Sequence, residues 1–262
     1  MKSQSAIMAC FFRCWRDISD DPLKNKVSMS DLPEKVDIAV LRTNGSEPGF
    51  WPALEGKIIP ALHKKQIKVV RSLPISELLK PDATAEGIFE KFFSWTKGLD
   101  GLCITTFNPL PEHERQQAEA ISAKLRNLLG KDRLFIYDAN EEGDVALIRS
   151  QAKNMDYLLL HAYGHRPERT QAIFDRAFDG FLPPSKFVPG FTFYEEHSGM
   201  PKGDVTEPFE GSLAYQKAKW QLNQGTKGGI FSFAVDRDGV KERDDRLLPT
   251  TFEWTKKLKR LL

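Results

Sequence analysis

Short apolar runs alternate with amphipathic segments along the whole chain. The runs are rich in β-branched and aromatic residues, and turn residues bound them, which is the pattern of buried β-strands. Eight runs of strand length are predicted at Ile7–Phe12, Val36–Leu41, Ile67–Leu73, Leu102–Phe107, Arg133–Asp138, Tyr157–Tyr163, Lys186–Phe193 and Gly229–Val235.

The intervening segments carry apolar residues at a spacing close to 3.6, which predicts amphipathic helices. Glu112–Leu129 is the clearest case, since Pro111 precedes it and Gly130 follows it. The large side chains Trp95 and Trp220 fall on predicted helices, so we expect both in the core. Helices are predicted at Phe50–Lys65, Thr84–Lys97, Glu112–Leu129, Glu142–Asn154, Glu168–Phe178, Ser212–Gln221 and Thr251–Leu262.

Eight strand–helix repeats in an uninterrupted chain predict an α/β fold, a closed (β/α)8 TIM barrel. An open doubly wound sheet is the less favoured alternative. No Pro-rich, Gly-rich or low-complexity linker divides residues 1–262, so a single domain is expected.

Composition excludes several classes of function. The 38 basic and 36 acidic residues nearly cancel, which does not indicate nucleic acid or an anionic membrane as partner. No apolar run reaches the ~18 residues of a membrane span. The three cysteines do not form a disulfide framework, and the five histidines lack metal-ligand spacing. No phosphate-binding loop opens a helix, so neither a metal nor a cofactor is predicted.

The functional residues of such a barrel lie at the carboxyl ends of the strands. There the chain supplies aromatic rings and polar tips, which together suit the apolar and hydroxyl faces of a sugar, although some of these rings would simply fill the core. The expected binding residues are Trp15, Arg71, Thr105, Phe107, Asn108, Tyr137, His161, Tyr163, Tyr194, Glu195, Asp236 and Asp238. Other polar residues placed at strand ends are Arg13, Arg42, Asp138 and Glu196.

One segment carries a recognisable motif. Residues 100–107, Asp-Gly-Leu-Cys-Ile-Thr-Thr-Phe, resemble the signature Asp-Gly-x-Asp-x-Asp-x-Glu of glycoside hydrolase family 18. Residues 12–39, 156–164 and 227–239 resemble other strands of that family, particularly of its endo-β-N-acetylglucosaminidases, which cleave the core of N-glycans. The resemblance covers essentially the whole chain.

The resemblance implies substrate-assisted catalysis, in which a Glu protonates the glycosidic oxygen and an Asp orients the 2-acetamido group. Phe107 stands at the acid position and Thr105 at the orienting Asp position. Cys103 replaces the inner Asp and His161 replaces a Gln, while Tyr163 matches a Tyr that binds the acetamido carbonyl. Because general acid catalysis needs a proton donor, we expect no catalytic residues here.

The resulting hypothesis is a non-catalytic protein that binds N-glycans or other glycans and glycoproteins carrying N-acetylglucosamine. Two alternatives stay open: an endo-β-N-acetylglucosaminidase with relocated acid residues, and a protein-binding scaffold or inhibitor in which Phe107 plugs the pocket. Cys103 as a nucleophile is disfavoured by its predicted place inside the barrel. The family resemblance implies an extracytoplasmic location, although the start of the chain lacks a recognisable signal peptide.

Overall fold

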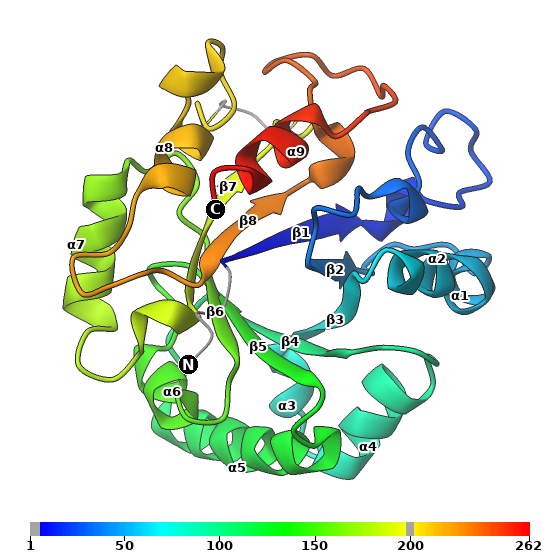
Figure 1. Ribbon diagram of the computed structural model, residues 1–262. Coiled ribbons are helices and arrows are strands. Elements are labelled where there is room, and N and C mark those ends of the chain that lie inside the picture. The colour runs from blue at the N-terminus through cyan, green and yellow to red at the C-terminus, as the bar shows by residue number, and fades with distance from the viewer. Residues whose placement is uncertain (1–5, 198–201) are drawn as a thin grey trace.

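A closed barrel of eight parallel strands forms the centre of the molecule, as predicted. The structure, a computed structural model, describes residues 6–197 and 202–262. Each strand pairs with its neighbours in chain order, and the eighth closes onto the first (Figure 1). The strands are β1 (Ile7–Arg13), β2 (Ile38–Arg42), β3 (Lys68–Pro74), β4 (Gly101–Thr106), β5 (Leu134–Ala139), β6 (Tyr157–Leu160), β7 (Phe187–Thr192) and β8 (Gly229–Phe233).

Helices surround the barrel on its outer side (Figure 1). None of the helices in the described ranges is long and apolar enough to cross a membrane. The α-helices are α1 (Phe50–Ala53), α2 (Ile59–Lys64), α3 (Ile75–Leu78), α4 (Ala85–Phe89), α5 (Glu112–Leu129), α6 (Val145–Gln151), α7 (Pro167–Ala177), α8 (Leu213–Lys219) and α9 (Glu253–Lys259).

The first repeat lacks an α-helix, so there are seven strand–helix repeats and not eight; no helix was predicted between the first two strands. Between β1 and β2, where every residue is described, the chain forms only the short 3₁₀ turns η1 (Cys14–Arg16) and η2 (Met29–Asp31). The other seven strands are each followed by an α-helix. The barrel is complete, and β1 is buried along its whole length although no α-helix follows it directly.

The expectation that Trp95 lies in the core is wrong, since its side chain is 69% exposed. The segment η4 (Glu90–Ser94) is a π-helix, and the Trp95 amide donates to the Glu90 carbonyl five residues back. A π turn holds more residues than an α turn, so it rotates the following side chains away from the face that α periodicity predicts. Trp220 is half-buried and packs against the core.

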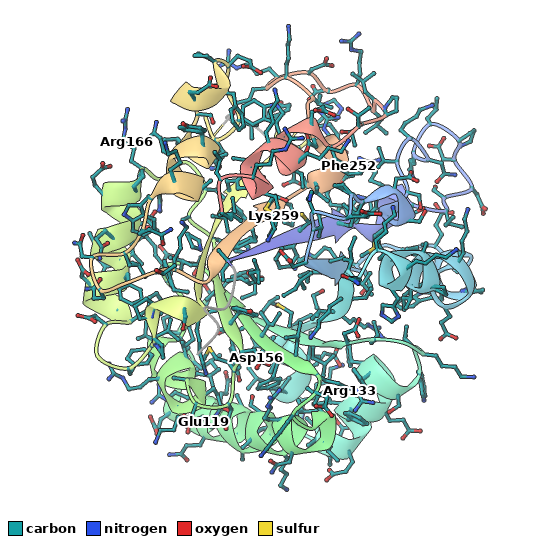
Figure 2. All side chains as sticks on the ribbon, in the orientation of Figure 1. Glu119, Arg133, Asp156, Arg166, Phe252 and Lys259 are labelled. Atoms are coloured by element: carbon teal, nitrogen blue, oxygen red, sulfur yellow. The ribbon has the colours of Figure 1, made fainter. Side chains whose placement is uncertain are left out.

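Aspartates clamp the amino ends of neighbouring strands. Asp37, Asp100 and Asp156 each precede an even-numbered strand and accept a hydrogen bond from a backbone N–H of the preceding strand. The donors are Met8 at 2.6 Å, Val69 at 2.7 Å and Phe135 at 2.7 Å. Asp37 also accepts from Lys259 Nζ at 2.7 Å, and Asp156 and Lys259 are labelled in Figure 2. Asp100, the first residue of the motif, therefore has a structural role at the amino end of the barrel.

Gly101, the second residue of the motif, is also structural. A Cβ atom there would lie 2.1 Å from the Leu134 carbonyl oxygen on β5, closer than side chains approach backbone. We expect Gly101→Ala to lower the free energy of unfolding by about 3 kcal/mol, because β4 and β5 must move apart. Urea denaturation measures this. Gly56→Ala is the control, since nothing lies within 4 Å of its Cβ, and equal losses in the two variants would contradict the steric explanation.

Candidate functional site

The carboxyl end of the barrel holds a cavity of about 260 Å³. Its walls come from the ends of seven of the eight strands, all but β3, and from the loops that follow them. The lining residues are Phe11, Arg42, Phe107, Asp138, His161, Tyr163, Thr192, Phe193, Tyr194, Glu195, Lys202, Phe233 and Glu242. We call this the main cavity.

A second cavity of about 270 Å³ opens beside the ends of β2, β3 and β4. Arg42 and Phe107 line both cavities, so they form the boundary between them. The Phe107 ring lies against His161, with ring centroids 4.9 Å apart. Phe107 therefore divides the space at this end of the barrel and leaves the main cavity open.

The carboxyl end of β4 carries no charged group. Cys103 points into the barrel core and is fully buried, while Thr105 is 6% exposed and lines the second cavity. Burial, with a smaller contribution from the charge of Asp138, raises the pKa of the Cys103 thiol well above its usual range. A protonated, enclosed thiol is a poor nucleophile, which agrees with the small apolar role expected for Cys103.

Three polar side chains line the main cavity next to one another. Asp138 is 1% exposed, and its Oδ1 lies 2.7 Å from His161 Nε2. The His161 ring stacks on Tyr163, with centroids 4.7 Å apart and an interplanar angle of 28°. Burial and the charge of Asp138 raise the pKa of Tyr163 well above its usual range, so its hydroxyl stays a donor. Asp138 and Tyr163 thus present an acceptor and a donor side by side.

A buried ion-pair cluster supports one wall of the main cavity. Arg13 is 2% exposed and contacts Asp236 at 2.6 Å, Glu196 at 3.0 Å and Glu195 at 3.3 Å. These partners come from the ends of β7 and β8, so the cluster ties three neighbouring strands together. Glu195 is the member that reaches the main cavity.

Seven of the twelve expected binding residues line the two cavities. Phe107, His161, Tyr163, Tyr194 and Glu195 line the main cavity, while Thr105 and Asn108 line the second one. The other five, Trp15, Arg71, Tyr137, Asp236 and Asp238, line neither of these cavities. Trp15 lies beside the Arg13 guanidinium at 5.8 Å, and Asp236 is the bidentate partner of Arg13.

The placement of Arg71 and Tyr137 needs correction, because both point outward. Side chains alternate across a strand, and on β3 and β5 the inward positions are their neighbours. Arg71 lies between the rings of Trp51 and Phe92, 4.7 Å from each centroid. The Tyr137 hydroxyl donates to Ser122 Oγ on α5 at 2.8 Å. Both residues join the barrel to its helices and line neither of the two cavities.

Asp238 also has a structural place. Its carboxylate accepts from the backbone N–H groups of Trp254 at 3.1 Å and Thr255 at 2.8 Å, which holds the start of α9. Burial raises the pKa of Asp238 to about 6, because the effect of burial exceeds that of the hydrogen bonds from Trp254 and Thr255, which lower the pKa. Asp238 therefore belongs to the helical layer and not to the rim.

This raised pKa predicts a pH dependence of stability. The folded protein binds the proton of Asp238 more tightly than the unfolded chain does. Its contribution to stability is therefore greatest below pH ~4 and falls as the pH rises through about 6. Relative to Asp238→Asn, we expect the wild-type protein to lose on the order of 2–3 kcal/mol between pH 4 and 7. Urea unfolding at both pH values measures this difference, and a constant difference would contradict the prediction.

The sequence-based list of binding residues missed Phe11, Arg42, Asp138, Thr192, Phe193, Lys202, Phe233 and Glu242. Arg42 and Asp138 were placed at strand ends but not among the binding residues. Asp138 is the neighbour of Tyr137 on β5. If the inward face of β5 had been assigned correctly, Asp138 would have taken the place of Tyr137 in the list of binding residues. Both faces of β5 are buried, and the chain offers no local signal for that assignment.

Comparison with known proteins agrees with the motif. The family model described as the endo-β-N-acetylglucosaminidase EndoS TIM-barrel domain matches residues 10–232. A solved endo-β-N-acetylglucosaminidase from Cordyceps militaris, in complex with fucosyl-N-acetylglucosamine-Asn, is 36% identical with a TM-score of 0.89, covering 98% of this chain and 90% of that one.

Curated relatives are more distant in sequence. Endo-β-N-acetylglucosaminidase F2 of Elizabethkingia meningoseptica is 28% identical, and the match spans 99% of this chain and 82% of the relative. EndoS of Streptococcus pyogenes serotype M1 is also 28% identical. That match covers 88% of this chain but only 29% of EndoS. The chain therefore belongs to the endo-β-N-acetylglucosaminidase family of glycoside hydrolase family 18 TIM barrels.

Proposed function

We propose that this protein binds N-glycans, or other glycans containing N-acetylglucosamine, at the carboxyl end of its barrel without cleaving them. The observation that carries the proposal is the pair Thr105 and Phe107 at the end of β4, where the family signature has Asp and Glu. A phenyl ring cannot protonate a leaving group, and a neutral hydroxyl cannot balance a developing positive charge.

The composition of the main cavity supports a sugar ligand. Phe11, Phe193, Tyr194 and Phe233 provide apolar ring surface, while Asp138 and several other polar residues provide hydrogen-bonding groups. Such a mixture matches the apolar and hydroxyl faces of a pyranose. A scaffold or inhibitor role would be favoured by a groove that Phe107 fills, but about 260 Å³ stays open beside it.

The Cordyceps militaris relative provides a second argument. Its complex with fucosyl-N-acetylglucosamine-Asn was obtained with a variant in which an Asp and a Glu two positions apart are replaced by the amides. Thr105 and Phe107 have the same spacing. In that relative, ligand binding does not require the two carboxylates, and we infer the same for this chain.

The alternative function is glycan hydrolysis by relocated acid groups. Asp138, Glu195 and Glu242 are carboxylates that line the main cavity, and this observation keeps the alternative open. Glu195 is paired with Arg13 at 3.3 Å, and Glu242 accepts a hydrogen bond from the Gly203 backbone N–H at 2.8 Å. Asp138 is the strongest candidate, because it lies beside Thr105 in the ladder between β4 and β5.

Titration calorimetry and mass spectrometry together test the proposal. Calorimetry with N,N′-diacetylchitobiose, high-mannose glycans and complex N-glycans should show binding, and mass spectrometry of N-glycoproteins after incubation should show no released glycan. Absence of binding to all three ligands would reject the proposal. Glycan release that Asp138→Asn, Glu195→Gln or Glu242→Gln abolishes would establish the hydrolase instead.

We further propose that the protein acts outside the cytoplasm, because N-glycans of mature glycoproteins face that side of the membrane. Fractionation of the producing cells followed by immunodetection tests this location. Recovery of the protein only from the cytosol would contradict it.

A further inference from the structure

The strand register places a buried carboxylate directly beside the position where the family signature has its orienting Asp. Thr105 on β4 and Asp138 on β5 are Cα partners in the parallel ladder. Both side chains point inward, because Cys103 and Ile136, two residues earlier on the same strands, lie inside the barrel. The negative charge that Thr105 lacks is thus present at the same level, one strand away.

One carboxylate oxygen of Asp138 is without a hydrogen-bonding partner within the described part of the chain. The side chain is 1% exposed, and its Oδ1 lies 2.7 Å from His161 Nε2, which leaves Oδ2 unpartnered. The buried Tyr163 hydroxyl is also unpartnered there. A buried polar group without a partner is costly, so these two groups beside one cavity indicate a polar ligand that satisfies them.

The arrangement of these groups suits a secondary amide. The carboxylate of Asp138 accepts hydrogen bonds only, when ionised, whereas the hydroxyl of Tyr163 can donate. An acetamido group has one N–H donor and one carbonyl acceptor, which is the complementary pair. An aromatic ring lies close by to contact its methyl group: Phe233, which lines the main cavity, is 6.2 Å from Tyr163, centroid to centroid.

We propose that Asp138 has taken over recognition of the 2-acetamido N–H of N-acetylglucosamine from the β4 position occupied by Thr105. Tyr163 donates to the acetamido carbonyl, and the His161 ring, stacked on Tyr163 and 2.7 Å from Asp138, positions both groups. Asp138 is therefore a specificity-determining residue that selects N-acetylglucosamine over glucose. This inference rests on the proposed glycan-binding function.

The test compares N,N′-diacetylchitobiose with cellobiose, which has hydroxyl groups in place of the acetamido groups. Calorimetry of Asp138→Leu should show about 10- to 100-fold weaker binding of chitobiose than the wild type, with little change for cellobiose. Asp138→Asn keeps the volume and one oxygen acceptor, so its loss should be smaller. Asp132→Leu, an exposed site in the turn before β5, is the matched control and should bind as the wild type does.

Thermal unfolding separates ligand recognition from a structural role. Because Asp138 Oδ2 lacks a hydrogen bond in the described part of the protein and Asp138→Asn keeps an oxygen for His161, we expect Asp138→Asn to unfold at about the wild-type temperature. A lower unfolding temperature with an unchanged preference for chitobiose would make Asp138 a structural partner of His161 and overturn the inference.

Failure of the inference is distinguishable from failure of the proposed function. If the wild type binds chitobiose and Asp138→Leu keeps the same preference over cellobiose, the inference alone is wrong. If the wild type binds no glycan containing N-acetylglucosamine, the proposed function fails and the inference fails with it.

Discussion

The double variant Thr105→Asp/Phe107→Glu is expected to release glycans from N-glycoproteins that the wild-type protein leaves intact. Both positions lie at the carboxyl end of β4 and line cavity walls, and Tyr163 is already in place across the main cavity. A positioned general acid contributes about 10²–10⁴-fold in rate. Mass spectrometry of a high-mannose glycoprotein should therefore show cleavage at least about 100-fold above background.

The matched control is Thr105→Asn/Phe107→Gln, which has nearly the same side-chain volumes and no acid. It should cleave nothing while binding chitobiose. Asp138 lies beside position 105 in the ladder, so the restored Asp would face a second carboxylate, and adding Asp138→Asn removes that repulsion. The acidic variant could fold, bind chitobiose and still cleave no better than the amide control. That result would contradict the prediction and show that restoring two carboxylates is not enough to make this barrel a hydrolase.

Arg13→Met is expected to lower the free energy of unfolding by about 3–5 kcal/mol, the largest stability effect we predict. Arg13 is 2% exposed and is paired with Asp236 and Glu196, which are themselves 4% and 7% exposed. Removing the guanidinium leaves these carboxylates buried with less compensation, and that penalty exceeds the loss of packing. Chemical denaturation followed by circular dichroism gives the measurement.

Arg16→Met is the control for Arg13, because Arg16 pairs with the same Glu196 but is 17% exposed. After that change Glu196 keeps its contacts with Arg13 and Arg237, so the loss should stay within about 1 kcal/mol. Similar losses for both variants would indicate that the cluster is solvated and that Arg13 is not central to it. Since Glu195 belongs to the same cluster, weaker glycan binding by Arg13→Met would link the cluster to the shape of the main cavity.

The two halves of the motif differ in what they do. Asp100 and Gly101 lie at the amino end of β4, where a hydrogen bond to Val69 and a close approach to Leu134 require them. The positions that depart from the signature, Thr105 and Phe107, lie at the other end, where the cavities open. The retained residues therefore support the fold, and their presence carries no information about catalysis.

The sequence by itself determined the barrel and indicated the end at which these two cavities open. Every predicted strand overlaps an observed one. The prediction succeeds because the alternation of apolar runs with amphipathic segments can be read locally along the chain. The absence of charge at Thr105 and Phe107 could also be read directly from the motif. The strand boundaries shifted by only a few residues, with the largest difference at β6, which ends at Leu160.

Only the tertiary structure decided which side chains face the cavity. In a barrel covered by helices both faces of each strand are apolar, so the sequence shows no alternation between apolar and polar residues. It therefore does not reveal that Asp138 faces inward while Tyr137 faces outward, or that Arg71 faces outward while its neighbours face inward. The pairing of Thr105 with Asp138 depends on the register between two strands that a long helix separates in sequence. Strand register and the direction in which side chains face arise from the closure of the whole barrel. For that reason the chain alone identified the strand that carries the family motif but not the carboxylate beside it.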